Sequence, residues 1–361
     1  MQVPVNGGSV LFNPRPKTRK DEFYDREFEL MTLERAVEKK VGLVIVLGIR
    51  RLGKSSLVNV FLNESPYPGI RIDARQLYFQ HKSVSPNALA KEILEGLIRI
   101  SGIEKVKQLI SGIRGVSFMG LSVEIKREHA TLTEILERIN EFGRFVLVID
   151  EAQYLRFSKA SYVDMLAWAI DELENVTFIL TGSEVGLLED LLRLHSPESP
   201  LFGRPYVEIK LERFSREQSL DFLKKGSEEV GIEVTPDELY EAVEELDGIV
   251  GWLTLYGYNR FLGLGHREAL GRLKEDAVKI VLSEFSKLKE ISPRYELIMR
   301  IVARGRHSWS EIKRSLEVIE GKKIDDRNFT NLLKNLVKYG YLEKTGEGYF
   351  IPDPLVEEAF R

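Results

Sequence analysis

The residues best suited to phosphate chemistry form one short glycine-rich segment. Residues 48–55, GIRRLGKS, match the pattern G-x-x-x-x-G-K-[ST] at every fixed position. Such a loop turns its backbone N–H groups and the start of the next helix toward anionic oxygens. Lys54 would bridge the β- and γ-phosphates of a nucleotide, and the Ser55 hydroxyl would ligate Mg²⁺. We therefore predict nucleotide contacts from Gly48, Ile49, Arg50, Arg51, Leu52, Gly53, Lys54, Ser55 and Ser56.

The flanks of this loop agree with the context that the pattern needs. Residues 43–47 are apolar and mostly β-branched, which predicts a buried strand, and residues 56–62 predict a helix. A chance match in a glycine-rich turn is the alternative. The order of strand, loop and helix favours binding of ATP or ADP together with Mg²⁺.

Two adjacent carboxylates follow a second apolar stretch. Asp150 and Glu151 come directly after residues 145–149, FVLVI. A strand buried on both faces must be apolar, and its C-terminal end lies at the edge where open α/β sheets bind ligands. Asp150 is predicted to hold Mg²⁺ through water, and Glu151 to orient or deprotonate the attacking water. A solvated acidic turn is the alternative, which the presence of the glycine loop disfavours.

Polar side chains also flank two later strands. Residues 176–183 form an apolar stretch that ends in Thr181 and Ser183, where a hydroxyl would lie beside the γ-phosphate. Ordinary turn chemistry explains the same residues equally well. Arg204 precedes the strand expected at 206–211, and it either reaches a phosphate or is a solvated charge.

Composition excludes several classes of protein. The 361 residues carry a net charge of −4, with 43% hydrophobic residues and no cysteine, so disulfides and cysteine-bound zinc are ruled out. The balance of charge gives no overall attraction to nucleic acid. We see neither a signal peptide nor an apolar run long enough for a membrane span. The expectation is a cytoplasmic protein that does not contact the membrane.

The order of patterns along the chain predicts three parts. Residues 1–212 read as an α/β P-loop core with a parallel sheet, beginning with an irregular basic segment at 1–22 and containing an insertion at 101–128. Residues 213–290 read as an all-α lid with helices at 215–230, 236–247, 249–262 and 266–289. Residues 291–361 read as a winged helix-turn-helix, with three helices and a two-stranded hairpin at 340–351.

Several of these stretches together resemble a known family. GIRRLGKSSL, with its two arginines, and the segments FYDREFEL, FVLVIDEAQYL, FILTGS and LFGRPYVEIKLERFS are similar to the archaeal P-loop ATPase family. That family belongs to the STAND-type branch of the AAA+ ATPases. The resemblance covers residues 23–361, and it implies an ATPase core, a helical lid and a C-terminal winged helix.

The resemblance also implies roles for single residues. Ser183 matches a sensor-like position, and Arg204 matches a Gly-Arg element whose arginine senses phosphate. Tyr24 and Arg26 match a segment that lies near the adenine in related proteins. The lid segment 247–253 resembles a Gly-x-Pro motif that touches nucleotide, but here Gly251 replaces the proline.

Two functions stay open at this point. The first is an ATP-hydrolysing molecular switch, with the slow turnover that the resemblance implies, whose winged helix binds a protein partner or another copy of the chain. The second is an ATP-dependent DNA-binding regulator or DNA-processing ATPase. Residues 291–361 hold 13 Lys and Arg against 11 Asp and Glu, a weak basic excess for a DNA reader. The helix at 325–339 would present to DNA the side chains of Arg327, Asn328, Asn331, Lys334, Asn335 and Lys338. A small-molecule transferase is disfavoured by the long lid and the winged helix.

Overall fold

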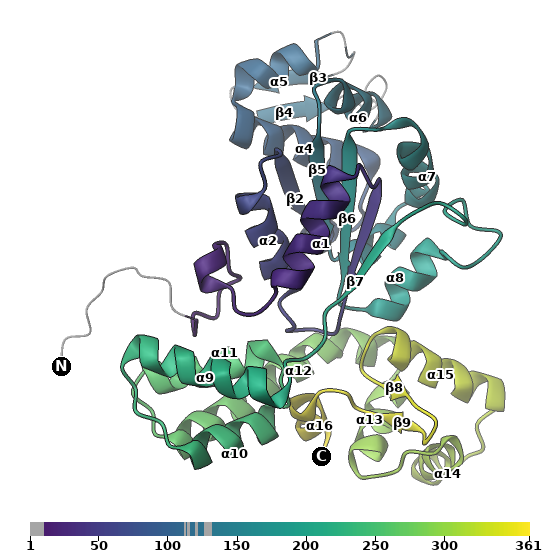
Figure 1. Cartoon of the computed structure of the whole chain (residues 1–361). Coiled ribbons are helices and arrows are strands. Elements are labelled where there is room, and N and C mark those ends of the chain that lie inside the picture. Colours follow the sequence, from purple (N-terminus) through teal and green to yellow (C-terminus); the bar gives the residue numbers. More distant parts are fainter. Residues whose placement is uncertain (1–10, 112, 114–115, 120–121, 126–131) are drawn as a thin grey trace.

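A five-stranded parallel sheet forms the centre of the computed structural model, which describes residues 11–111, 113, 116–119, 122–125 and 132–361. Figure 1 shows helices on both faces of this sheet. The strand order is β2-β5-β6-β1-β7, so β6 separates the strand before the glycine loop from the strand before the two carboxylates. The strands are β1 (Leu43–Leu47), β2 (Gly69–Asp73), β5 (Phe145–Asp150), β6 (Val176–Gly182) and β7 (Val207–Lys210). The predicted α/β core with a parallel sheet is confirmed.

The direction of the strands determines which residues can meet. All neighbouring pairs run parallel, for example with Leu47 beside Gly182 and Asp73 beside Asp150. Residues that follow β1, β5 and β6 therefore lie together at one edge of the sheet, and residues that precede a strand lie at the opposite edge.

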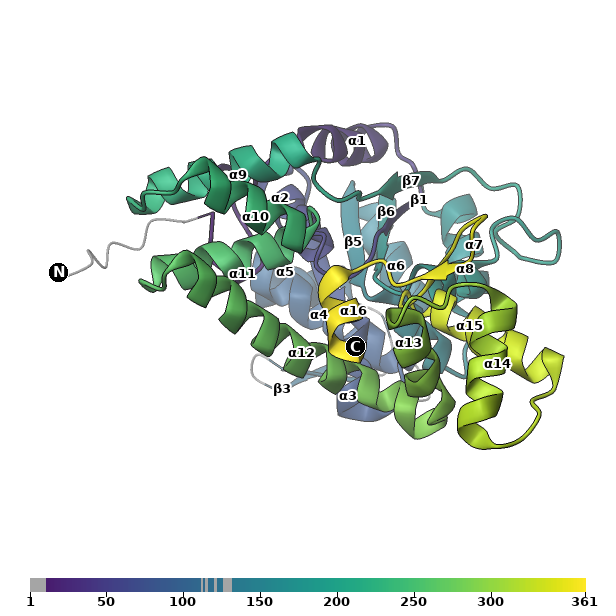
Figure 2. The ribbon, with the colours of Figure 1, turned by 90° about the horizontal axis from the view of Figure 1, so that it is seen from below.

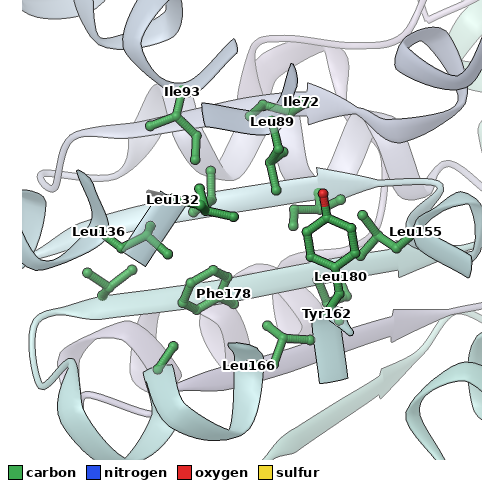
Figure 3. Packing of buried hydrophobic residues seen from close by; sticks show 14 of the residues in the cluster. Ile72, Leu89, Ile93, Leu132, Leu136, Leu155, Tyr162, Leu166, Phe178 and Leu180 are labelled. Carbon is green, nitrogen blue, oxygen red and sulfur yellow. The ribbon is translucent and has the colours of Figure 1, made fainter. Parts of the chain in front are cut away.

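The apolar residues of the strands alternate between two buried clusters, one on each face. Leu43, Ile45 and Leu47 of β1 join the first cluster, while Val44 and Val46 join the second. Helices α4 (Pro86–Ser101), α6 (Leu132–Glu141), α7 (Tyr162–Glu172) and α8 (Val185–Leu192) cover the first face. Figure 3 shows labelled side chains of α4, α6 and α7 together with Phe178 and Leu180 of β6 in this cluster. Helices α1 (Glu27–Glu38) and α2 (Lys54–Glu64) cover the other face.

The fold contains elements that the sequence patterns do not predict. After β2 the chain forms α3 (Ala74–His81), which packs against the 3-10 turn η2 (Ala152–Phe157) that follows the two carboxylates. The expected insertion contains α5 (Ile103–Leu109) and the antiparallel pair β3 (Val116–Met119) and β4 (Ser122–Ile125). In the predicted irregular segment, residues 1–10 lie outside the described residues, and the rest includes the short turn η1 (Lys20–Glu22).

Four helices follow the core where the lid is predicted. They are α9 (Arg216–Val230), α10 (Pro236–Leu246), α11 (Val250–Phe261) and α12 (His266–Ile291). Ser215 and Thr235 begin α9 and α10 with reciprocal capping boxes, which explains their sharp starts. Figure 2 shows α9, α10 and α11 on one side of the molecule and α13, α14 and α15 on the other, with α12 extending between them.

The C-terminal winged helix is confirmed and has one further helix. Its elements are α13 (Arg294–Ala303), α14 (Trp309–Glu320), α15 (Asp326–Lys338), β8 (Glu343–Lys344), β9 (Tyr349–Phe350) and α16 (Pro354–Phe360). The last turns of α12 supply Val281, Phe285 and Leu288 to its core. Helix α12 thus belongs to two packing units, and the domain boundaries at 212 and 290 stay predictions.

Candidate nucleotide-binding site

A cavity of about 960 Å³ opens between the C-terminal edge of the sheet and the lid. Its walls come from the loop after β1, from α11 and α12, and from the residues after α15. Cavities of this size commonly hold small molecules. The predicted site residues that line it are Tyr24, Arg26, Arg50, Arg51, Leu52, Gly53, Lys54, Ser55, Ser56, Glu151 and Ser183.

The loop between β1 and α2 has the backbone that phosphate binding requires. Gly53, directly before α2, has φ +91°, a left-handed conformation that suits glycine. Lys54 is buried, and its Nζ donates hydrogen bonds of 2.7 Å to the carbonyl oxygens of Gly48 and Ile49. Burial lowers the pKa of the Lys54 ammonium to about 8, against the raising effect of nearby carboxylates. A bound phosphate would favour the charged lysine.

Asp150 and Ser55 meet at the place expected for Mg²⁺. The Ser55 hydroxyl donates to Asp150 Oδ2 at 2.9 Å, Arg71 Nε donates to the same oxygen at 2.9 Å, and Thr181 donates to Oδ1. Burial pushes the pKa of the Asp150 carboxyl upward, but Arg71 and the hydroxyls outweigh it and hold that pKa below its usual range. An anionic carboxylate beside a hydroxyl fits Mg²⁺, which keeps waters and substrate phosphates among its ligands.

Two neighbours hold the side chain of Glu151. Ser183 Oγ donates to Glu151 Oε2 at 2.7 Å, and Gln153 Nε2 donates to the same oxygen at 2.6 Å. The backbone of Glu151 has φ +54°, an uncommon conformation outside glycine that often occurs at functional sites. The structure therefore brings together the predicted general base and the predicted sensor-like serine.

The two residues expected near adenine line the cavity together with aromatic and apolar side chains such as Phe214 and Leu255. The Tyr24 hydroxyl donates to Asp221 at 2.5 Å, and the Tyr24 ring packs edge-on against Phe214. Arg26 is buried and donates to the carbonyl of Glu212 at 2.7 Å, with its guanidinium over the ring of Phe214. Aromatic and apolar walls of this kind suit a flat base.

Arg204 does not line this cavity, and the prediction that it senses the γ-phosphate is wrong. It precedes β7, and β7 runs parallel to β1 with Val207 beside Val44. Arg204 therefore lies at the N-terminal edge of the sheet, opposite the glycine loop. Its Nε and Nη2 donate to the two carboxylate oxygens of Asp171 at 2.9 and 2.5 Å.

The first loop arginine contacts the winged helix. Arg50 Nη2 donates to Glu184 Oε1 at 2.8 Å, and its Nη1 donates to the carbonyl oxygen of Tyr339 at 3.1 Å. The guanidinium also lies 5.0 Å from the ring centroid of Tyr341, within cation–π range. Tyr339 and Tyr341 follow α15, so the phosphate loop and the winged helix are in direct contact.

The second loop arginine contacts the lid. Arg51 Nη2 donates to Glu284 of α12 at 2.8 Å, and its guanidinium stacks 4.3 Å from the Trp252 ring. The carbonyl oxygen of Arg51 accepts a 2.9 Å hydrogen bond from the N–H of Gly251. A proline at position 251 has no N–H to donate, and an added Cβ would lie 2.7 Å from the Arg51 Cβ. Glycine at position 251 thus permits a close contact between lid and loop.

The sequence patterns do not identify several residues that the structure places at this site, namely Arg71, Gln153, Arg156, Glu184, Tyr339 and Tyr341. Arg71 lies between two buried isoleucines in β2 (GIRID), and this strand ends at the ligand-binding edge. Gln153 and Arg156 lie in η2, directly after the two carboxylates. Like Glu151, they follow a strand and should therefore lie at the edge of the sheet that binds ligands. The sequence around Tyr339 and Tyr341 does not indicate a role at the nucleotide site. These residues reach the phosphate loop only because the winged helix packs against the core.

Comparison with known families agrees with this geometry. Residues 23–255 match the family described as an ATPase domain predominantly from Archaea. The chain belongs to this archaeal ATPase family. Residues 289–352 match the C-terminal winged helix-turn-helix domain of MCM proteins. The chain is therefore a P-loop ATPase that binds and hydrolyses ATP and carries a C-terminal winged helix.

Solved structures agree with the family. The Walker-type ATPase PABY2304 of Pyrococcus abyssi is 38% identical, with 98% of this chain and 100% of that chain covered and a TM-score of 0.86. The Orc1 protein of Aeropyrum pernix in complex with DNA is 17% identical (94% and 92% covered, TM-score 0.45). The STAND protein PH0952 of Pyrococcus horikoshii, with a tetratricopeptide repeat sensor, is 16% identical (96% and 43% covered, TM-score 0.37). These last two likenesses are too distant to transfer a function.

Neither the curated proteins nor the helices of this chain add a further indication of function. A search of curated proteins finds no sequence that matches this chain. Within the part of the chain that the structure describes, no helix has both the length and the apolar character needed to cross a membrane. The cellular compartment stays a prediction.

Proposed function

We propose that this ATPase works as a STAND-type switch, in which the bound nucleotide sets the positions of the lid and the winged helix relative to the core. One observation carries the proposal: the two arginines inside the phosphate loop contact the winged helix and the lid, respectively. A nucleotide that moves the loop must therefore disturb both contacts. Such a ligand shifts the arrangement only as far as its affinity differs between the two states.

The residues at the sheet edge have complementary roles in this proposal. Lys54 would exchange its bonds to the loop carbonyls for bonds to phosphate oxygens. Ser55 and Asp150 would hold Mg²⁺, which would supply charge neutralisation on the leaving phosphates. Glu151 orients the attacking water and accepts its proton. Since Ser183 and Gln153 both donate to Glu151, they fix the direction of its carboxylate.

Small-angle scattering and limited proteolysis test the switch. Wild-type protein would be compared free, with ADP and with a non-hydrolysable ATP analogue, and Lys54→Ala would serve as the control that cannot respond. We expect the ATP analogue to change both the radius of gyration and the cleavage pattern around residues 339–353. Identical profiles with saturating ADP and ATP analogue would refute the switch.

The second candidate function is ATP-dependent DNA binding through α15, and one observation favours it. Arg327, Asn328, Asn331 and Lys334 are exposed on this helix, and these residue types suit phosphates and base edges. The C-terminal end of the helix is covered, because Lys338 pairs with Asp190 of α8 at 2.5 Å. We infer that release of the winged helix would complete this surface.

An electrophoretic shift assay separates the two functions. DNA binding that strengthens with the ATP analogue, weakens between two salt concentrations and is reduced by Arg327→Ala with Lys334→Ala supports the DNA-binding candidate. Absence of any shift at low salt leaves the winged helix as a surface for a protein partner or for a second copy of the chain.

A further inference from the structure

A buried carboxylate lies between two guanidinium groups in the wall of the nucleotide cavity. Glu184 is 7% exposed, and its Oε1 accepts from Arg50 Nη2 at 2.8 Å. Its Oε2 lies 4.0 Å from Arg156 Nη1. All three residues line the cavity together with Lys54 and Glu151. Glu184 directly follows Ser183, which donates to Glu151, so the cluster adjoins the catalytic carboxylate.

Arg156 is only partly satisfied in this arrangement. Its Nη1 is buried and has no hydrogen-bond partner among the described residues. Its guanidinium lies 4.6 Å from the ring centroid of Phe157 and 5.7 Å from that of Tyr339. A buried donor without an acceptor is costly. An arginine held between two rings with a free N–H facing a cavity is therefore suited to accept an anionic oxygen from a ligand.

The position of the cluster indicates which phosphate it meets. The lysine of a phosphate loop reaches the β- and γ-phosphates, and the catalytic carboxylate lies beside the γ-phosphate where water attacks. Lys54 would contact the β-phosphate, which ATP and ADP share, as well as the γ-phosphate, so it would keep part of its contact with ADP and discriminate poorly between the two. Arg50 lies close enough to Glu151 to feel its charge, and Arg156 lies beside Glu184, two residues after Gly182 at the end of β6. Both guanidinium groups are therefore near the end of the cavity where only ATP would carry a phosphate.

The same two arginines also hold the turn after α15. Arg50 donates to the carbonyl of Tyr339 and stacks on Tyr341, while Arg156 lies over the ring of Tyr339. The Tyr341 hydroxyl is buried without a hydrogen-bond partner in the described structure. The contact between this turn and the core therefore leaves one buried polar group unpaired. A shift of either guanidinium would release the turn.

We propose that Arg50 and Arg156 are the residues that distinguish ATP from ADP, because the terminal phosphate of ATP displaces Glu184 as their anionic partner. In the structure the carboxylate beside the two guanidinium groups is that of Glu184. When a γ-phosphate binds the two guanidinium groups, they move off Tyr339 and Tyr341, and the winged helix loses its anchor on the core. This inference rests on the proposed switch and assigns its trigger.

Competition titrations with ADP and with an imido-bridged ATP analogue test the assignment through affinity, without turnover. Arg156→Ala should weaken analogue binding by about 10- to 100-fold, the value of a charge-assisted hydrogen bond, and leave ADP binding within about twofold. Arg156→Lys keeps the positive charge but not the paired N–H donors of the guanidinium, so it should lose less affinity for the analogue than Arg156→Ala. Arg204→Ala is the matched control, since this arginine pairs with a carboxylate at the opposite edge, and it should change neither affinity.

Glu184→Gln should change the affinity for the ATP analogue in the opposite direction. An increase in affinity could not result from a general loss of structure. It keeps the shape of the side chain but removes the competing charge, so the ATP analogue should bind several-fold more tightly while the turn at 339–341 becomes more sensitive to protease.

If wild-type protein responds differently to analogue and ADP but Arg156→Ala keeps the wild-type affinity ratio, the assignment is refuted and the switch survives. If wild-type protein does not distinguish the two nucleotides in proteolysis, the switch itself fails. A weaker analogue affinity in Glu184→Gln would also overturn the assignment.

Discussion

A buried carboxylate, that of Asp353, links the winged helix to lid helix α11, and its removal should loosen the C-terminal helix. Asp353 is 5% exposed and accepts from Trp252 Nε1 with both oxygens, at 3.0 and 2.9 Å. It also begins α16 by accepting from the N–H groups of Leu355 and Val356. Burial raises the pKa of this carboxyl, and the Trp252 bond opposes the rise. We predict that Asp353→Ala destabilises α16 and its packing on α12.

The expected magnitude follows from the donors left without an acceptor. Loss of the cap of α16 costs about 1–2 kcal/mol, and an unsatisfied indole N–H in the fully buried Trp252 side chain costs about 1–3 kcal/mol. The sum is about 2–5 kcal/mol. In a Trp252→Phe background the indole donor is absent, so the same substitution should cost only the cap. The double-mutant cycle should therefore show a coupling of about 1–3 kcal/mol.

Amide hydrogen exchange is the suitable assay, because a chain with several packing units need not unfold in one step. Exchange of the Leu355 and Val356 amides should accelerate in Asp353→Ala by the factor that corresponds to the lost free energy. Asp353→Asn keeps a good capping residue and should fall between wild type and alanine. Unchanged exchange in α16, or strictly additive effects with Trp252→Phe, would show that the buried carboxylate is not the connection.

Three further predictions concern the catalytic edge of the sheet. Lys54→Ala should lose most affinity for both ATP and ADP, and equal affinities of mutant and wild type in calorimetry would contradict the assigned loop. Glu151→Gln should bind ATP normally but turn it over much more slowly, because an amide cannot accept the proton; a wild-type rate would require another base. Asp150→Asn should shift the Mg²⁺ concentration that supports turnover upward, and a Mg²⁺ titration that overlays wild type would remove Asp150 from the metal site.

The parts of the fold that were predictable are those that local sequence determines. Buried strands such as 43–47 and 145–149 are uniformly apolar because both faces are covered, so composition alone identifies them. The lid helices were placed within two residues at each end, because capping residues and glycines mark their limits. Short helices such as α3 and α16 were missed, since a pattern of seven or eight residues holds too few turns to establish a period.

Contacts between distant parts of the chain could not be predicted in this way. Arg50 and Tyr339 are 289 positions apart, and Trp252 and Asp353 are 101 apart. No pattern within either segment indicates the other. Their meeting depends on how α12 carries the winged helix back toward the core, which is a property of tertiary packing.

The contrast between Arg204 and Arg156 shows how much strand direction alone can decide. Both arginines lie close to a core strand in sequence, and the family motif favoured Arg204. In a parallel sheet, however, a residue before a strand lies at one edge and a residue after a strand lies at the other. Arg204 precedes β7 and pairs with Asp171 far from the loop, whereas Arg156 follows β5 and lines the nucleotide cavity. Because the amino-acid sequence by itself predicts the parallel sheet, it also predicts which edge each arginine occupies. Strand direction therefore favours the residues after Glu151, and not position 204, as the place of a phosphate-sensing arginine.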